Sequence, residues 1–228
     1  MNTLLDLSDR LYVDVLDFAH STPHWFQWLA EVWTEAGLLL FGVLFLAGWW
    51  RSREGSSRAM ALALLAPLAT AFGYVVSESF KSLVDEERPC RSVAGAPASL
   101  ITCPPHGDWS FPSNHAAIAG AAAIALALSW RGIVWLTVPM ALLMAFSRVF
   151  VGVHYPHDVT VGVLLGGLVA FLVMRTAARP VASLVDTARS SGNTAVVWCA
   201  GRGPRVHAAG GRAARRTEEA RRARHGAR

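Results

Sequence analysis

The chain has 228 residues, of which 53% are hydrophobic and only 16% are charged, and its mean hydropathy is +0.35. Average soluble domains carry about 25% charged residues, so this composition argues against a soluble protein. The formal net charge of +5 does not indicate a nucleic-acid-binding protein, because twelve of the arginines lie in residues 175–228. The apolar residues fall in blocks, and several blocks reach the roughly 20 residues that cross a bilayer.

Residues 3–20 place apolar side chains at helical spacing, with aspartates between them. This pattern is typical of an amphipathic helix that lies on a membrane surface. Two membrane spans are predicted next, over about 25–50 and 59–80, and a short arginine-rich turn separates them. Tryptophans lie toward both ends of the first span, where interfacial aromatic residues belong.

Residues 82–111 form a polar loop that is rich in proline, serine, glycine and charge. A loop of this length with no clear element of its own is uncommon in a compact domain and is often functional. It contains Cys90 and Cys103. In an oxidising compartment these two cysteines would be able to form a disulfide, and two free thiols are the alternative.

Three further spans are predicted over about 114–130, 133–151 and 157–174. The first of them is rich in alanine, and small residues let membrane helices approach closely. The last contains Gly162-x-x-x-Gly166, which predicts a close packing face, although glycines that merely tolerate lipid are the alternative. The expected fold is all-α, a multi-pass membrane bundle of about five transmembrane helices preceded by the amphipathic helix.

After Met174 the chain becomes rich in arginine, alanine and glycine. This shift predicts a membrane domain over residues 1–177 and a basic, disordered tail over 178–228. Arginine and lysine accumulate in cytoplasmic loops, so the tail and the arginine-rich turns are expected in the cytoplasm. The 82–111 loop and the turn near residue 154 are then extracytoplasmic, as in a protein of the bacterial inner membrane. The sequence predicts neither the oligomeric state nor the role of the tail.

Three polar clusters share the extracytoplasmic side of this arrangement. They are Lys81-x6-Arg88-Pro89, Phe111-Pro112-Ser113-Asn114-His115 and Ser147-Arg148-x5-His154-x3-Asp158. Each cluster alone has an ordinary explanation, such as a snorkelling lysine, a helix cap or an interfacial histidine. His157, next to the third cluster, is expected to be interfacial, and Asp108 in the loop is expected to be solvated.

Together the clusters are suited to bind and cleave a phosphate. Lys81, Arg88 and Arg148 supply three cations, and arginine suits the bidentate recognition of phosphate oxygens. The helix start at residue 114 adds free backbone N–H groups and the positive end of a helix dipole.

The two histidines have the positions of a nucleophile and an acid. Asp158, in the first turn after Pro156, would reach back to one ring nitrogen of His154 and leave the other nitrogen as the nucleophile. His115 would protonate the leaving oxygen and later activate water. This chemistry gives a phosphohistidine intermediate.

The three clusters, in this order and with these spacings, resemble the signature motifs of the type 2 phosphatidic acid phosphatase (PAP2) superfamily, which also includes vanadium-dependent haloperoxidases. The resemblance covers Lys81 to Asp158. It implies phosphate binding by Lys81, Arg88, Arg148, Ser113 and the backbone at Asn114, acid–base catalysis by His115, and nucleophilic attack by His154 with Asp158 as its partner. The second motif of the family usually has glycine where this chain has Asn114, so that position is less secure. Members of the family work without a metal, so no metal or cofactor is expected.

The small size and the outward-facing site resemble bacterial undecaprenyl (or other polyprenyl) diphosphate phosphatases. The implied reaction is hydrolysis of a polyprenyl diphosphate to the monophosphate at the membrane. Phosphatidate or phosphatidylglycerophosphate is the runner-up substrate, and a polyprenyl-phosphosugar phosphate is the third. An anion transporter is the alternative of a different class, but the charges lie at span ends and no inverted repeat is seen. A haloperoxidase is disfavoured because such enzymes are soluble. A purely scaffolding role is disfavoured because His154, His115 and Asp158 are all present.

Overall fold

The computed structural model describes residues 2–204, with side chains from residue 5 onward. Every regular element in this range is a helix, so the all-α prediction is confirmed. In chain order the elements are α1 (Asn2–Ser21), α2 (His24–Ser52), α3 (Ser57–Lys81), α4 (Pro89–Ser92), α5 (Asn114–Ser129), η1 (Arg131–Ile133), α6 (Val134–Phe150), α7 (Pro156–Arg189) and α8 (Thr194–Ala200).

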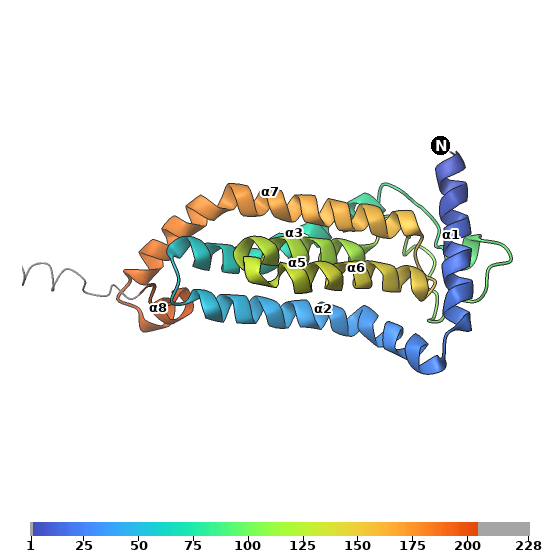
Figure 1. The fold of residues 1–228 in the computed structure, drawn as a ribbon. Coiled ribbons are helices and arrows are strands. Elements are labelled where there is room, and N and C mark those ends of the chain that lie inside the picture. The colour runs from blue at the N-terminus through green and yellow to red at the C-terminus, as the bar shows by residue number, and fades with distance from the viewer. Residues whose placement is uncertain (1, 205–228) are drawn as a thin grey trace, which may run out of the picture.

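Four segments are long and apolar enough to cross a membrane: α2, α3, α7 and the continuous stretch Arg131–Phe150. They run side by side along one axis (Figure 1). The fifth predicted span, α5, has only 16 residues, which is about 24 Å at 1.5 Å per residue. It packs between α3, α6 and α7, and most of its alanines are buried, so it forms the centre of the bundle.

Glycines allow the backbones of α5 and α7 to touch. A Cβ atom added to Gly166 would lie 2.0 Å from the carbonyl oxygen of Ala117, and one added to Gly162 would lie 2.6 Å from that of Ser113. No larger residue fits at these distances without moving a helix, so the predicted close packing face is confirmed. The same contact brings the start of α5 to the start of α7, where the Ser113 N–H donates to the Asp158 carbonyl at 3.2 Å.

Helix α1 lies across one end of the bundle instead of along it (Figure 1). Tyr12 and Leu16 are fully buried, and the Tyr12 hydroxyl donates to the Gly152 carbonyl at 3.1 Å. On the outer face, Leu11 and Phe18 are exposed. The amphipathic helix is therefore present, and it covers the turn between α6 and α7. Its contact with a membrane surface stays a prediction.

Helical structure continues beyond residue 177 in the part of the chain that the structure describes, and the predicted domain boundary stays a prediction. Helix α7 continues without a break to Arg189, because Val181 and Val185 extend its apolar face onto the buried Met60 and Ala61 of α3. Helix α8 then folds back, and the Arg189 side chain donates to the Ala200 carbonyl at 3.1 Å. Composition alone suggested disorder, but arginine and alanine also favour helices. Residues 205–228 of the predicted tail lie outside the described residues.

Candidate active site

The three predicted motifs meet at the end of the bundle that α1 covers. Each contributing residue lies at the end of a helix or in the loop next to it. Lys81 ends α3, Arg88 precedes α4, Ser113 precedes α5, Asn114 and His115 begin α5, Arg148 lies in the last turn of α6, His154 lies between α6 and α7, and Asp158 lies in the first turn of α7. The cations, His154 and Asp158 are buried. Because the charged groups are at helix ends, they reach the site without crossing the apolar part of the bundle.

His154 and Asp158 form the predicted pair. The Nδ1 atom of His154 lies 3.2 Å from Oδ2 of Asp158. The same carboxylate oxygen accepts a hydrogen bond from the Tyr155 N–H at 2.9 Å and one from the Ser110 hydroxyl. A carboxylate fixed in this way favours the tautomer of His154 that carries its proton on Nδ1. The other nitrogen, Nε2, then carries the lone pair and accepts a hydrogen bond from Arg88.

The Nε2 atom of His154 lies 3.2 Å from Nη1 of Arg88, one of the cations predicted to bind phosphate. Complete burial, followed by the positive charges of Arg88, Arg148 and Lys81, lowers the pKa of His154 well below its ordinary value of 6.5. Both causes act against the charged imidazolium form. The ring is therefore neutral at physiological pH, as a nitrogen nucleophile must be.

Asp108 occupies the space between two of the cations. Its Oδ1 atom accepts hydrogen bonds from Nζ of Lys81 at 2.9 Å and from Nη2 of Arg88 at 3.0 Å. Partial burial would raise the pKa of Asp108, but the hydrogen bonds and charges of Lys81 and Arg88 outweigh burial and lower it. Asp108 is partly exposed, as expected of a loop residue, and it also binds two of the predicted site residues. The carboxylate sits where oxygens of a bound phosphate would meet the same two donors.

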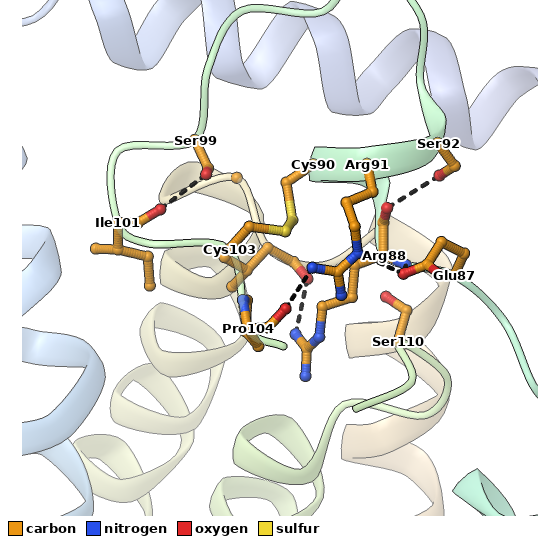
Figure 2. The surroundings of a disulfide bond; sticks show 12 residues. Glu87, Arg88, Cys90, Arg91, Ser92, Ser99, Ile101, Cys103, Pro104 and Ser110 are labelled. Atoms are coloured by element: carbon orange, nitrogen blue, oxygen red, sulfur yellow. Dashed lines mark hydrogen bonds and ion pairs between the residues drawn. A yellow bond between two sulfur atoms is a disulfide. The ribbon is translucent and has the colours of Figure 1, made fainter. Parts of the chain in front are cut away.

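The loop that carries Arg88 is closed by a disulfide. Cys90 and Cys103 are bonded, with their Cα atoms 6.1 Å apart, so the possible bridge is confirmed. Figure 2 shows this bond beside Arg88, with Arg91 directed back to Pro104 of the same loop. The guanidinium of Arg88 also donates to the Val153 carbonyl at 3.0 Å. The bridge and these hydrogen bonds fix the short segment that aims Arg88 at His154.

Arg148 and Ser113 keep polar atoms that the described residues do not satisfy. Nη1 of Arg148 donates to the Thr34 hydroxyl of α2 at 3.2 Å. Its Nε atom and the Ser113 hydroxyl are buried without a hydrogen-bond partner in residues 5–204. Buried polar groups are rarely left unpaired. Both belong to the predicted phosphate-binding set, and an oxygen-rich anion would satisfy them.

The side chain of Asn114 is bound by helix α3. Its Oδ1 atom accepts from the Ser77 hydroxyl at 2.8 Å, and its Nδ2 atom donates to the Glu78 carboxylate. The residue that replaces the usual glycine therefore ties the start of α5 to α3. Any phosphate contact at this position is left to the backbone, as the resemblance implied.

Helix α2 completes the site with residues that no motif indicated. Besides Thr34, it supplies Glu35, whose Oε1 atom lies 3.5 Å from Nε2 of His115. His115 interacts electrostatically with Arg148 and with His154, so the predicted acid belongs to the same charged cluster as the predicted nucleophile. In the sequence, Thr34 and Glu35 look like ordinary polar residues near the entrance of a span, and nothing marked them as functional.

The comparison with known families agrees with this geometry. The profile of the PAP2 superfamily matches residues 61–181, which is more than half of the chain. The chain belongs to the PAP2 superfamily. The matched range contains the three motifs, α5 and α6 and most of α3 and α7, whereas α1 and α2 precede it. With its long apolar helices, this PAP2 protein is an integral membrane protein.

Three curated relatives of this PAP2 protein are phosphatases. It is 39% identical to undecaprenyl-diphosphatase of Sulfolobus acidocaldarius over 99 residues, which are 43% of this chain and 47% of that protein. It is 34% identical to undecaprenyl-diphosphatase BcrC of Bacillus subtilis over 143 residues, which are 62% and 70% of the two chains. It is 35% identical to decaprenylphosphoryl-5-phosphoribose phosphatase of Mycobacterium tuberculosis over 112 residues, which are 48% and 58%. The chain thus spans about half to 70% of the length of these relatives.

The fold is similar to that of a solved PAP2 enzyme. The crystal structure of a transmembrane PAP2 type phosphatidylglycerolphosphate phosphatase from Bacillus subtilis superposes with a TM-score of 0.58 and 21% identity. The match covers 76% of this chain and 85% of that one. At this level of identity the likeness concerns the fold alone.

Proposed function

We propose that this protein is a lipid phosphatase that removes the terminal phosphate of a polyprenyl (undecaprenyl-type) diphosphate. The observation that carries the proposal is the pairing of His154 with Asp158 beside Arg88, which leaves Nε2 of a neutral histidine directed at a cation. The PAP2 motifs and two relatives named undecaprenyl-diphosphatase support the substrate class.

The reaction divides into two steps. Nε2 of His154 attacks the terminal phosphorus while Lys81, Arg88 and Arg148 hold the phosphoryl oxygens. The P–O bond to the lipid monophosphate breaks, and His115 gives a proton to the leaving oxygen. In the second step His115 takes a proton from water, the water oxygen attacks phosphorus, and the P–N bond of the phosphohistidine breaks to release inorganic phosphate.

An apolar groove supports a lipid substrate. A cavity of about 260 Å³ lies between α2 and α6, and its lining includes Phe26, Trp33, Phe146 and Ser147. Ser147 hydrogen-bonds to the same Thr34 hydroxyl that holds Arg148. A prenyl chain in this groove would place its phosphate beside Arg148. A larger cavity of about 590 Å³, at the α8 end, has none of the predicted catalytic residues in its lining.

The site is proposed to face the extracytoplasmic side. Arg51, Arg53 and the turn at Arg131 are at the end of the bundle opposite His154, and arginine-rich ends favour the cytoplasm. The disulfide beside Arg88 suits an oxidising compartment. Labelling of single-cysteine variants in intact cells, at the end of the bundle near α1 and at the end near α8, tests this orientation.

A phosphorylated polyprenyl-phosphosugar is the second candidate substrate, because the third relative is named for that activity. Phosphate release by the purified full chain, in one detergent, is compared for polyprenyl diphosphate, the phosphosugar lipid, phosphatidate and phosphatidylglycerophosphate. Polyprenyl diphosphate is expected to give the highest kcat/KM. A higher value for any other lipid overturns the substrate assignment.

The nucleophile is tested with the variant His154→Ala. It is expected to release no phosphate and to retain no radiolabel after a quench with terminally labelled substrate, while its melting temperature stays close to that of the wild type. The exposed His106 provides a matched control, and His106→Ala is expected to keep both activity and labelling. Full activity of His154→Ala refutes the mechanism.

A further inference from the structure

The sequence predicts an ordinary interfacial role for His157. In the structure its ring lies close to two carboxylates, those of Glu86 and Asp158, next to the turn that carries His154. The Nε2 atom of His157 is 2.9 Å from Oε1 of Glu86 and 3.2 Å from Oδ1 of Asp158. The three donor atoms all lie within 4.8 Å of one another. They come from the 82–111 loop and the first turn of α7, which the fold brings together.

The cluster leaves one buried oxygen poorly satisfied. Asp158 is fully buried, and its Oδ1 atom has no hydrogen-bond partner in residues 5–204. The one N–H at Nε2 of His157 donates to a single carboxylate at a time. Nε2 is closer to Glu86, at 2.9 Å, than to Asp158, at 3.2 Å, so Glu86 is the favoured acceptor. An unpaired buried carboxylate oxygen is costly. A cation with two or more coordination positions would satisfy both carboxylates at once.

The spacing of the donors suits a small divalent ion. Zinc bonds to histidine nitrogen and carboxylate oxygen are about 2.0–2.2 Å long, so tetrahedral ligand atoms lie about 3.4 Å apart. The observed separations of 2.9 and 3.2 Å are a few tenths of an ångström shorter. An imidazole donor with two carboxylates favours a transition metal over calcium or magnesium, which prefer six or more oxygen ligands.

The surroundings of His157 resemble the support that metal-binding histidines usually have. Its Nδ1 atom lies 2.7 Å from the Ser8 hydroxyl of α1, and its ring stacks on Tyr155 with centroids 5.1 Å apart. A hydrogen bond from Nδ1 fixes the ring and leaves Nε2 for a metal. Asp9 of α1 interacts electrostatically with Glu86 and His157, so the cluster carries excess negative charge.

We propose that Glu86, His157 and Asp158 form an inhibitory site for a divalent transition metal ion such as Zn²⁺. The ion replaces the proton on Nε2 of His157, and this proton is released to water. Asp158 is shared, because Oδ1 would bind the metal while Oδ2 holds His154. The ion draws negative charge away from His154, and the phosphohistidine step slows. Binding itself does not depend on the proposed function, whereas inhibition rests on it.

Binding is tested on the purified full chain without reference to activity. Co²⁺, added alone, is expected to give the visible absorption bands of a tetrahedral site, and Zn²⁺ is expected to displace it. In His157→Asn and Glu86→Gln the affinity for Zn²⁺ is expected to fall by more than about tenfold. The matched control is His106→Asn, because His106 has one carboxylate partner, Glu87, at 2.8 Å and is mostly exposed. Zinc affinity that is unchanged in His157→Asn overturns the site.

Inhibition is tested with the phosphatase assay. Zn²⁺ is expected to lower the kcat of the wild type and of His106→Asn, and the concentration for half inhibition is expected to rise by more than tenfold in His157→Asn. A chelator is expected to restore activity. Zinc that binds at His157 without lowering kcat overturns the inhibitory role. If the wild type cleaves no lipid phosphate, the proposed function fails, and the spectroscopic test of the metal site still stands.

Discussion

Replacing Asp108 with asparagine is expected to tighten the binding of phosphate groups. In the structure its carboxylate holds Lys81 and Arg88 at 2.9 and 3.0 Å, so a substrate phosphate must displace it from both cations. Asparagine keeps the shape and one acceptor oxygen but removes the charge. The variant therefore preserves the loop while it weakens the internal competitor.

The size of the effect follows from the exposure of the pair. A hydrogen bond to a charged group contributes about 1.5–3 kcal/mol when it is well buried, whereas exposed ion pairs contribute at most about 1 kcal/mol. Lys81 and Arg88 are buried, but the Asp108 side chain is 44% exposed. Removing its charge is therefore expected to make the binding free energy of a phosphate group more favourable by about 1 kcal/mol. This difference corresponds to roughly a fivefold change in affinity.

Steady-state kinetics with lipid diphosphate, and inhibition by orthovanadate as a phosphate analogue, measure this change. Both KM and the inhibition constant of Asp108→Asn are expected to fall about fivefold. Asp17→Asn, an equal charge change at an exposed position of α1, is the control and is expected to leave both values unchanged. A KM that rises together with a lower kcat would refute the competition and make Asp108 a residue that positions Lys81 and Arg88.

Three further outcomes follow from the site. Because the pKa of His154 lies well below 6.5, the ring stays deprotonated as the pH falls through 6.5, so kcat/KM is expected to show no acid limb near that pH. A limb there that persists when each of the other histidines is replaced would contradict this. A variant with serine at both positions 90 and 103 lacks the Cys90–Cys103 bridge, which closes a separation of 13 residues. Its free energy of unfolding is expected to fall by about 2–3 kcal/mol, and a melting temperature equal to that of the wild type would argue against this stabilisation. Glu35→Gln removes a carboxylate 3.5 Å from Nε2 of His115, so the proposed acid loses an orienting partner and kcat is expected to fall, with Glu35→Asp as the rescue and Glu31→Gln as the control.

The order of the helices and the meeting of the three motifs at one end of the bundle were predictable because two strong patterns coincide. Long apolar blocks define the spans, and charged residues at their ends are costly unless they are functional. Asp158, in the first helical turn after Pro156, was expected to reach back to His154 before the helix, and the two side chains meet at 3.2 Å. The Gly162 and Gly166 pattern also predicted the close contact that brings α5 to α7.

The contributions of Asp108, Thr34 and Glu35 could not be read from the sequence. Each depends on a distance between segments far apart in the chain. Asp108 lies in a loop whose path is set by a disulfide, and its contact with Lys81 spans 27 residues. Thr34 meets Arg148 across 114 residues, and this pairing depends on how α2 packs against α6. In a sequence, a polar residue near the start of a span that binds a site residue looks the same as one that only faces interfacial water.

The candidate site includes residues that lie outside the part of the chain that carries the three motifs. The range that matches the PAP2 superfamily begins at residue 61, yet Arg148 is held by Thr34 of α2, and His157 is held by Ser8 of α1. Residues before 61 therefore touch a phosphate-binding cation, the proposed acid and the proposed metal cluster. PAP2 proteins that share the motifs have the same reacting groups, so differences in substrate or in regulation must come from elements around them. In this chain, α1 and α2 are the elements placed to make such a difference.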